Sequence, residues 1–212
     1  MPIGDLPILE ILVRQLKAAG CSEIILAVGY LAALIQAYFG DGSQWGVPIR
    51  YSREKTPLGT AGPIGVVDGL DDSFLVMNGD ILTSLDFQGL YRFHRNRRGT
   101  ATVCRCNRIV KLNLGIVKIG EDGRVSDYIE KPSLEYQVSM GIYAFTPDIL
   151  DHIPKGAYMD LPDLIRSLLA RGVPVESYDF KGLWFDIGNL DEYEGAVELF
   201  LKDPKVFLAG DQ

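Results

Sequence analysis

Two acidic residues of this chain follow apolar runs that have the length of a buried strand. Residues 74–80 read FLVMNGD and end on Asp80, and residues 183–188 read LWFDIG and contain Asp186. In an open α/β sheet, strands buried on both faces are continuously apolar, and ligands bind just beyond their carboxyl ends. Asp80 and Asp186 are therefore candidates for partners at the rim of one ligand site, although Asn-Gly-Asp on its own also favours a plain turn.

A glycine-containing loop lies upstream of the first acidic residue. Residues 58–62 read LGTAG, and Pro63 follows them. Gly59 and Gly62 carry no Cβ, so the backbone could approach a planar or anionic ligand, and amides at a helix start can bind its oxygens. A flexible connection between a strand and a helix has the same composition and is the alternative.

A charged pair, Glu130 and Lys131, precedes Pro132. Successive side chains of a strand point to opposite faces, so at most one of the two would face a pocket unless the proline bends the chain. A solvated pair at the end of a strand is the alternative interpretation.

Apolar periodicity predicts the elements that position these residues. Helices are expected over residues 6–19, 32–39, 87–97, 160–170 and 191–201, and a helical segment is expected from the LGTAG loop to Gly69. Strands are expected over residues 23–28, 47–51, 74–80, 101–105, 114–119, 125–130, 137–145 and 183–188. The first half alternates strand and helix, which predicts a parallel sheet covered by helices on both faces, whereas the second half is mixed.

Two further expectations concern single residues. Asp160, with Asp163 three positions on, is expected to cap the helix over residues 160–170. His94 is expected to be a surface or hydrogen-bonded histidine without a catalytic role.

The composition limits the classes of function. The 212 residues are 47% hydrophobic and 23% charged, which is typical of a soluble globular protein, and the net charge of −7 gives no basic field for nucleic acid. A small anionic ligand fits better than a polymer. Three cysteines form no zinc pattern and are interpreted as ordinary core residues in a reducing compartment. No membrane span or signal peptide is recognised, so a cytoplasmic protein is expected.

Five motifs in order resemble those of the sugar-1-phosphate nucleotidylyltransferases, and most closely those of mannose-1-phosphate guanylyltransferase-like members. They are LGTAG at 58–62, NGD at 78–80, EKP at 130–132, GIYAF at 141–145 and W-x-D-I-G at 184–188. The resemblance implies one domain over residues 1–212, with a nucleotide-binding part over about 1–100 and a sugar-binding part with the closing metal-site strand over about 101–201. The implied fold is α/β, a doubly wound, mixed but mainly parallel, Rossmann-like sheet.

The resemblance also implies a reaction and a set of site residues. An NTP and a sugar 1-phosphate would give an NDP-sugar and pyrophosphate, with GTP and mannose 1-phosphate as the first choice and UTP or dTTP with glucose 1-phosphate as the alternative. Asp80 and Asp186 would hold Mg²⁺ and, with Lys131, form the catalytic set. The implied nucleotide contacts are Leu58, Gly59, Thr60, Gly62, Asn78 and Gly79, and the implied sugar-phosphate contacts are Gly115, Glu130, Lys131, Ser139 and Gly141.

The chain departs from the family pattern at two places. The family opens with a strand and a glycine-rich phosphate loop, and both are absent from this sequence, so its activity is expected to be impaired. A non-catalytic module that binds nucleotides or sugar nucleotides is the alternative function, and a homo-oligomer formed through exposed sheet edges is a further expectation. Ser139-Met140 stands where the family often has Asn-Ala, which questions the sugar contact at Ser139.

Overall fold

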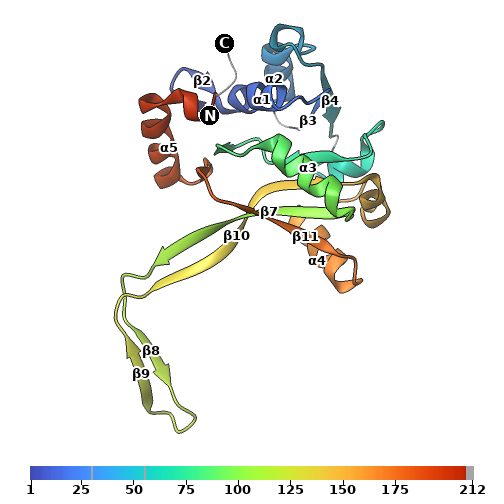
Figure 1. Cartoon of the computed structure of the whole chain (residues 1–212). Coiled ribbons are helices and arrows are strands. Elements are labelled where there is room, and N and C mark those ends of the chain that lie inside the picture. Colours follow the sequence, from blue (N-terminus) through green and yellow to red (C-terminus); the bar gives the residue numbers. More distant parts are fainter. Residues whose placement is uncertain (30, 55, 209–212) are drawn as a thin grey trace.

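A mixed four-stranded sheet lies at the centre of the computed structural model, which describes residues 1–29, 31–54 and 56–208 (Figure 1). In spatial order its strands are β11 (Val175–Phe180), β7 (Ala101–Lys111), β10 (Ser133–Phe145) and β5 (Phe74–Met77). β11 runs parallel to β7, whereas β10 runs antiparallel to both β7 and β5. β7 and β10 are the two longest strands, with 11 and 13 residues, so they extend well past their neighbours.

Helices cover both faces of this sheet. Successive residues of β10 point to opposite faces, so each face carries apolar side chains that pack against a helix. Ile142 belongs to an apolar cluster with Leu90 of α3 (Phe87–Arg97), whereas Phe145 belongs to a second cluster with Leu164 of α4 (Leu161–Ala170). Asp86 caps the start of α3, because its carboxylate accepts a hydrogen bond from the Gly89 N–H at 2.9 Å. The two clusters hold one helix on each face of the sheet.

Helix α1 (Ile8–Ala18) joins the central sheet to a second, parallel pair of strands, β3 (Ile24–Val28) and β4 (Ile49–Arg53). The helix α2 (Ala32–Phe39) connects these two strands. Apolar residues recur along α1 every three to four positions, and Leu9 and Leu16 pack against the apolar clusters of both sheets. The helix therefore fixes the two sheets to one another.

A third pair of strands lies beside α1. β6 (Ile81–Thr83) and β12 (Trp184–Asp186) are antiparallel, and α5 (Leu190–Lys202) follows β12. Their apolar side chains share a cluster with Ile3, next to the short pair β1 (Pro2–Ile3) and β2 (Leu6–Pro7). Four short 3₁₀ helices complete the described elements, at Ser43–Trp45, Gly62–Val66, Pro147–His152 and Pro204–Val206.

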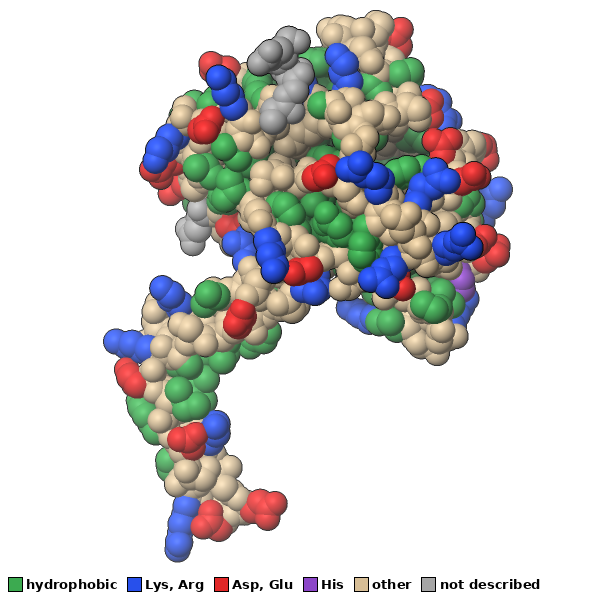
Figure 2. Space-filling view, viewed as in Figure 1, with side chains coloured by type: hydrophobic (Ala, Val, Ile, Leu, Met, Phe, Trp, Pro, Cys, Tyr) green, Lys and Arg blue, Asp and Glu red, His purple; other side chains and the backbone are tan. Residues whose placement is uncertain are grey.

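A long two-stranded arm projects from this body (Figures 1 and 2). It consists of the outer halves of β7 and β10 and of the hairpin β8 (Ile116–Ile119) and β9 (Val125–Ile129). The turn at residues 121–123 joins β8 to β9, as the sequence predicts. We call residues 107–139 the arm.

The α/β class, the mixed sheet and the helices on both faces are confirmed. The expectation of a mainly parallel sheet is wrong, because only β3–β4 and β7–β11 are parallel among the seven strand pairs of the described residues. The reason is that β7 and β10 are the two sides of one long hairpin, which forces antiparallel pairing. β5 is half-buried rather than fully buried, since β10 is its one partner among the described strands.

Three other expectations are corrected. The segment after the LGTAG loop is a 3₁₀ helix that ends at Val66, not a helix that continues to Gly69. The strand β11 is missing from the sequence prediction, because VESYDF alternates only weakly between apolar and polar residues. Asp160 precedes α4, but its side chain makes no capping hydrogen bond to the helix.

Cys104 and Cys106 lie in the apolar core beside α3, as expected, and burial raises the pKa of the Cys104 thiol to about 12. Across the described residues, no helix combines the length and the hydrophobicity that crossing a membrane requires.

His94 on α3 is fully buried, and its Nδ1 lies 2.9 Å from the Thr102 hydroxyl oxygen. Burial lowers the pKa of its imidazole below the ordinary value of 6.5, because a buried site disfavours the charged ring. The unfolded chain therefore binds more protons than the folded chain at mildly acidic pH.

We expect the free energy of unfolding to fall as the pH is lowered from neutral through about 6.5, by at most about 1.4 kcal/mol per pH unit for one histidine. Chemical denaturation at several pH values measures this slope. The His94→Gln variant should show a shallower slope than the wild type. Equal slopes in the wild type and His94→Gln would contradict the assignment.

Candidate functional site

The pairing of β6 with β12 brings Asp80 and Asp186 together from positions more than a hundred residues apart. Asp186 lies opposite Ile81 in the strand register, and the Ile187 N–H donates to the Asp80 carbonyl oxygen at 3.0 Å. Both acidic residues are exposed, whereas Ile81 and Ile187 are buried beneath them. Asp80 stands in the connection between β5 and β6 rather than at the end of β5. The apolar residues thus anchor the pair and leave two carboxylates at the surface.

A network of side chains fixes the backbone around Asp186. Its N–H donates to Glu192 Oε2 at 2.8 Å, and the same carboxylate oxygen accepts from Arg108 Nη2 at 2.8 Å. The Arg108 guanidinium also lies 4.8 Å from the centre of the Trp184 ring, and the Trp184 indole N–H donates to the Met140 carbonyl at 3.0 Å. Strand β12 is therefore held in place by Arg108 of β7, Met140 of β10 and Glu192 of α5.

Sequence reasoning did not identify Arg108 or Glu192. Trp184 was visible as part of the W-x-D-I-G motif, but its partner Arg108 lies in a strand 76 positions away, where nothing in the local pattern distinguishes it. Glu192 lies near the start of α5, where an acidic residue is common for reasons of helix electrostatics alone.

Asn78, Ser139 and Gly141 lie together where β10 crosses β5. The Asn78 N–H donates to the Gly141 carbonyl at 3.0 Å, and a Cβ on Gly141 would lie 2.8 Å from Asn78 Nδ2. Gly141 has a φ of +69° and lies in an irregularity of the β7–β10 pairing, which explains why glycine stands there. The Ser139 hydroxyl lies 3.1 Å from the Tyr143 hydroxyl. Gly79 follows Asn78, with Leu9 as its neighbour.

The LGTAG loop packs closely against the segment before α4. The Ala61 and Gly62 N–H groups donate to the Met159 carbonyl at 2.8 and 3.0 Å, and the Met159 N–H donates to the Leu58 carbonyl at 2.9 Å. A Cβ on Gly59 would lie 2.6 Å from the Met159 carbonyl oxygen. Gly59 and Gly62 therefore permit close packing within the chain itself, and their approach to a nucleotide stays a prediction.

The space beside the two loop glycines is filled by the chain, although the sequence suggested room for a ligand. A Cβ on Gly62 would lie 2.6 Å from the Ala157 carbonyl oxygen, as close as the corresponding approach at Gly59. A tight loop of this kind can still present its outer amides to a nucleotide. The loop holds the segment before α4 in place through these contacts. Replacing Gly59 or Gly62 would therefore lower the free energy of unfolding, whether or not the loop binds a nucleotide.

Thr60 supplies the helix cap that the sequence assigned to Asp160. Its hydroxyl accepts from the Leu161 N–H at 2.8 Å, at the first residue of α4. The Asp160 carboxylate instead accepts from the Tyr158 hydroxyl at 2.7 Å and from the Thr60 N–H at 3.0 Å, and these hydrogen bonds, the one from Tyr158 first, lower the pKa of Asp160. A residue a hundred positions away thus caps this helix, which a local pattern cannot reveal.

Gly115, Glu130 and Lys131 lie on the arm, not beside the two carboxylates. The Tyr128 hydroxyl donates to Glu130 Oε2 at 3.0 Å, and Lys131 Nζ lies 4.0 Å from Glu130 Oε1. Lys131 has a φ of +43°, which is unusual for a residue other than glycine, and stands where the arm bends between β9 and β10 (Figure 1). The structure therefore divides the predicted site residues between the body and the arm.

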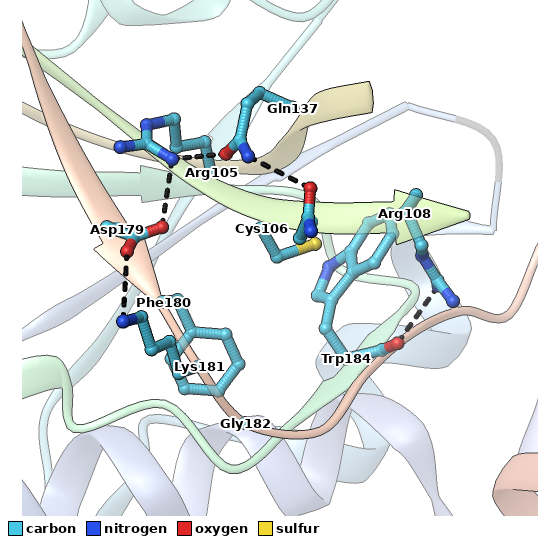
Figure 3. A pocket seen from close by; sticks show the side chains of 10 residues that line it. Arg105, Cys106, Arg108, Gln137, Asp179, Phe180, Lys181, Gly182 and Trp184 are labelled. Carbon is cyan, nitrogen blue, oxygen red and sulfur yellow. Dashed lines mark hydrogen bonds and ion pairs between the residues drawn. The ribbon is translucent and has the colours of Figure 1, made fainter. Parts of the chain in front are cut away.

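A pocket of about 660 Å³ opens where β11 ends, between β7 and the chain leading to β12 (Figure 3). Its lining includes Arg105, Arg108 and Lys181, and none of the site residues predicted from the sequence. Each of these cations has a carboxylate within 4 Å, since Arg105 and Lys181 contact Asp179 at 2.8 and 3.9 Å and Arg108 contacts Glu192. Three cations thus share two carboxylates, Asp179 and Glu192, beside Trp184, and of the two carboxylates only Asp179 lines the pocket.

The chain matches a known protein family and has curated relatives. A family model described as nucleotidyl transferase matches residues 1–203. A mannose-1-phosphate guanylyltransferase from Mycobacterium tuberculosis is 33% identical over 211 residues, and a UTP–glucose-1-phosphate uridylyltransferase from Synechocystis is 32% identical over 217 residues. These alignments cover 94% and 93% of this chain but 57% and 56% of the relatives, so the chain spans somewhat more than half of their length.

A solved structure supports the same fold. HddC from Yersinia pseudotuberculosis superposes with a TM-score of 0.72 at 22% identity, over 94% of this chain and 88% of the other. The body is thus a Rossmann-like α/β fold with an acidic pair at one strand junction. The chain belongs to the nucleotidyl transferase family.

The packing of the LGTAG loop makes a testable prediction about stability. Gly59 and Gly69 have similar φ values, +74° and +72°, but a Cβ would meet backbone atoms only at Gly59. We expect Gly69→Ala to cost about 1–2 kcal/mol of unfolding free energy, from the left-handed conformation alone. Gly59→Ala should cost at least about 1 kcal/mol more, because the Met159 carbonyl must move as well.

Urea denaturation of both variants measures the difference, and the Gly69→Ala variant is the matched control. If the two variants were equally stable, the loop would not be packed against Met159 as described.

Proposed function

We propose that this chain transfers a nucleotidyl group from an NTP to a sugar 1-phosphate, giving an NDP-sugar and pyrophosphate. The observation that carries the proposal is the pair of exposed carboxylates, Asp80 and Asp186, which the β6–β12 strand pair holds on the body of a nucleotidyl transferase fold. In this reaction a sugar-phosphate oxygen attacks the α-phosphorus in line. The protein must supply positioning and charge stabilisation rather than a covalent nucleophile.

The two carboxylates fit a bound Mg²⁺. Magnesium is commonly held by one or two carboxylates and completes its coordination with water and phosphate oxygens. Within the described residues no group of three or more acidic, histidine or cysteine side chains could hold a metal ion, so Asp80 and Asp186 would share the metal with the substrate. When bound, Mg²⁺ would offset the negative charge of the triphosphate.

The remaining site residues would orient the substrates. Glu192 and Arg108 hold the backbone of Asp186, so its carboxylate starts from a fixed position. Residues of the LGTAG loop, with Asn78 and Gly79, are proposed to contact the nucleotide. Gly141 on the body, Ser139 at the base of the arm, and Gly115, Glu130 and Lys131 further out on the arm are proposed to contact the sugar phosphate.

Lys131 and Glu130 impose a geometric requirement on this proposal. Glu130 and Lys131 lie between β9 and β10, whereas Asp80 lies between β5 and β6 and Asp186 ends β12. Figure 1 shows the hairpin of β8 and β9 projecting away from the body. The contact of Glu130 and Lys131 with a sugar phosphate bound near Asp80 therefore requires the arm to close toward the body.

We propose GTP and mannose 1-phosphate as the substrate pair, because the LGTAG loop resembles that of guanylyltransferases. UTP or dTTP with glucose 1-phosphate is the alternative, and a uridylyltransferase is among the relatives. A cytoplasmic location is also proposed, supported by three free cysteines. Self-association through the unpaired edges of β3 and β5 likewise stays a prediction.

The metal assignment is tested by replacing each carboxylate. Asp80→Asn and Asp186→Asn should each lower Mg²⁺-dependent pyrophosphate release by about a hundredfold or more, since one charge-stabilising group is worth at least that much. Asp163→Asn, an exposed acid on α4 paired with Arg166, is the control and should keep wild-type turnover. Normal turnover in either site variant would refute the assignment for that residue.

The substrate pair is tested in the same assay by comparing GTP with mannose 1-phosphate against UTP and dTTP with glucose 1-phosphate. Higher kcat/KM with GTP and mannose 1-phosphate is expected. If no pair releases pyrophosphate while the chain still binds nucleotide in a titration, the chain is a nucleotide-binding module instead.

A further inference from the structure

Tyr128 connects two of the proposed sugar-phosphate contacts on the arm, although it is not itself among the site residues predicted from the sequence. Its hydroxyl donates to Glu130 Oε2 at 3.0 Å, and in the register of the hairpin it lies opposite Val117. Gly115 is two positions before Val117, and Glu130 is two positions after Tyr128. Alternate residues of a strand share a face, so these four residues lie on one face of the hairpin. Gly115, Tyr128 and Glu130 therefore form one cluster.

Gly115 makes room for the ring of Tyr128. Its φ lies outside the left-handed region, so the backbone conformation does not require glycine at this position. A Cβ there would collide with the Tyr128 hydroxyl oxygen and would lie 2.5 Å from Tyr128 Cζ and 3.1 Å from Glu130 Oε2. The missing Cβ thus lets the Tyr128 side chain cross diagonally to the start of β8, a span that aromatic side chains can cover in an antiparallel pair.

The hydrogen bond from Tyr128 restrains a carboxylate that has few other restraints. Lys131 Nζ lies 4.0 Å from Glu130 Oε1, but the side chains of Lys131 and Glu130 are 66% and 59% exposed, so this ion pair is weak. An exposed glutamate populates several rotamers, and fixing one of them when a ligand binds costs free energy. The Tyr128 hydroxyl favours one orientation of the carboxylate before any ligand is bound.

We propose that Tyr128 is a positioning residue that holds the Glu130 carboxylate ready to accept hydrogen bonds from the hydroxyls of the sugar phosphate. This inference rests on the proposed function, in which Glu130 contacts the sugar. An ionised carboxylate offers about four lone-pair sites, so acceptor sites stay open on both oxygens after one hydrogen bond from Tyr128. Tyr128 acts through Glu130 and takes no part in the transfer of the nucleotidyl group.

The cluster is complete on the hairpin itself. Gly115, Tyr128 and Glu130 lie on or next to β8 and β9, which Figure 1 shows projecting from the body. The carboxylate is therefore oriented before the arm approaches the body. The Tyr128 ring is 60% exposed, whereas the core ring of Tyr143 is 4% exposed, so burial of the Tyr128 ring contributes comparatively little to stability.

The variant Tyr128→Phe tests the role of the hydroxyl, because it keeps the ring and removes only the donor to Glu130. In the pyrophosphate-release assay we expect the KM for the sugar phosphate to rise about three- to tenfold, the range for the loss of one hydrogen bond. The kcat, the KM for the NTP and the urea-denaturation midpoint should not change. The control is Tyr136→Phe, an exposed tyrosine of the arm whose hydroxyl makes no hydrogen bond to any described residue, and it should keep all wild-type values.

A double-mutant cycle separates positioning from direct contact. If Tyr128 acts through Glu130, the variants Glu130→Ala and Tyr128→Phe/Glu130→Ala should have the same kcat/KM for the sugar phosphate. An unchanged KM in Tyr128→Phe would overturn the proposal. So would a further loss in the double variant by the same factor as in Tyr128→Phe alone, because the hydroxyl would then contact the substrate without Glu130.

A binding measurement distinguishes failure of this inference from failure of the proposed function. Mannose 1-phosphate and glucose 1-phosphate are titrated calorimetrically into the wild type and Tyr128→Phe, with a non-hydrolysable GTP analogue present. Binding that weakens in Tyr128→Phe, without turnover in the wild type, would refute the proposed function and support the positioning role. Normal turnover with equal binding in both chains would do the reverse. A chain that neither binds nor turns over either sugar phosphate would refute both.

Discussion

The short antiparallel pairing of β6 with β12 is the interaction on which the site depends. It joins two segments about a hundred residues apart through backbone hydrogen bonds and through hydroxyl groups at one end, where Thr83 Oγ1 donates to the Leu183 carbonyl at 3.0 Å and the Leu183 N–H donates to Ser84 Oγ at 3.0 Å. Three residues per strand would be a weak pair in isolation. Leu82 and Ile187 are buried in a shared apolar cluster, so burial supplies the stability that the hydrogen bonds alone do not.

The same pairing explains why the carboxylates are exposed while their neighbours are buried. Ile187 is buried against α1 and α5, so the neighbouring Asp186 points the other way and is exposed. Strand β6 is buried at all three positions, and Asp80 is exposed because it lies before the strand, in the β5–β6 connection. The arginine, glutamate and tryptophan network then fixes β12 from the other side. Because Arg108 is both stacked on Trp184 and bonded to Glu192, replacing it with lysine would lose the planar contact as well as the fork of donors.

Sequence alone predicted the helices of this chain well and its long-range contacts poorly. α1 and α3 have clear apolar periodicity and terminal signals, so their bounds were predicted to within two residues. β7 and β10 were predicted too short, because their outer halves carry polar and charged residues and pair with each other outside the core. The placement of Asp80 beside Asp186 was anticipated from two similar motifs. The capping of α4 by Thr60 and the role of Arg108 depend on folded contacts that no local pattern encodes.

The division of the site between a packed body and an exposed arm has a consequence for how the two parts behave. Elements with many buried apolar contacts open rarely, whereas segments with exposed hydrogen bonds and few buried contacts open at low free-energy cost. The carboxylates belong to the first kind and Glu130 with Lys131 to the second. Lys131 lies in the connection between β9 and β10, so bending at this connection would set where Lys131 stands relative to Asp80.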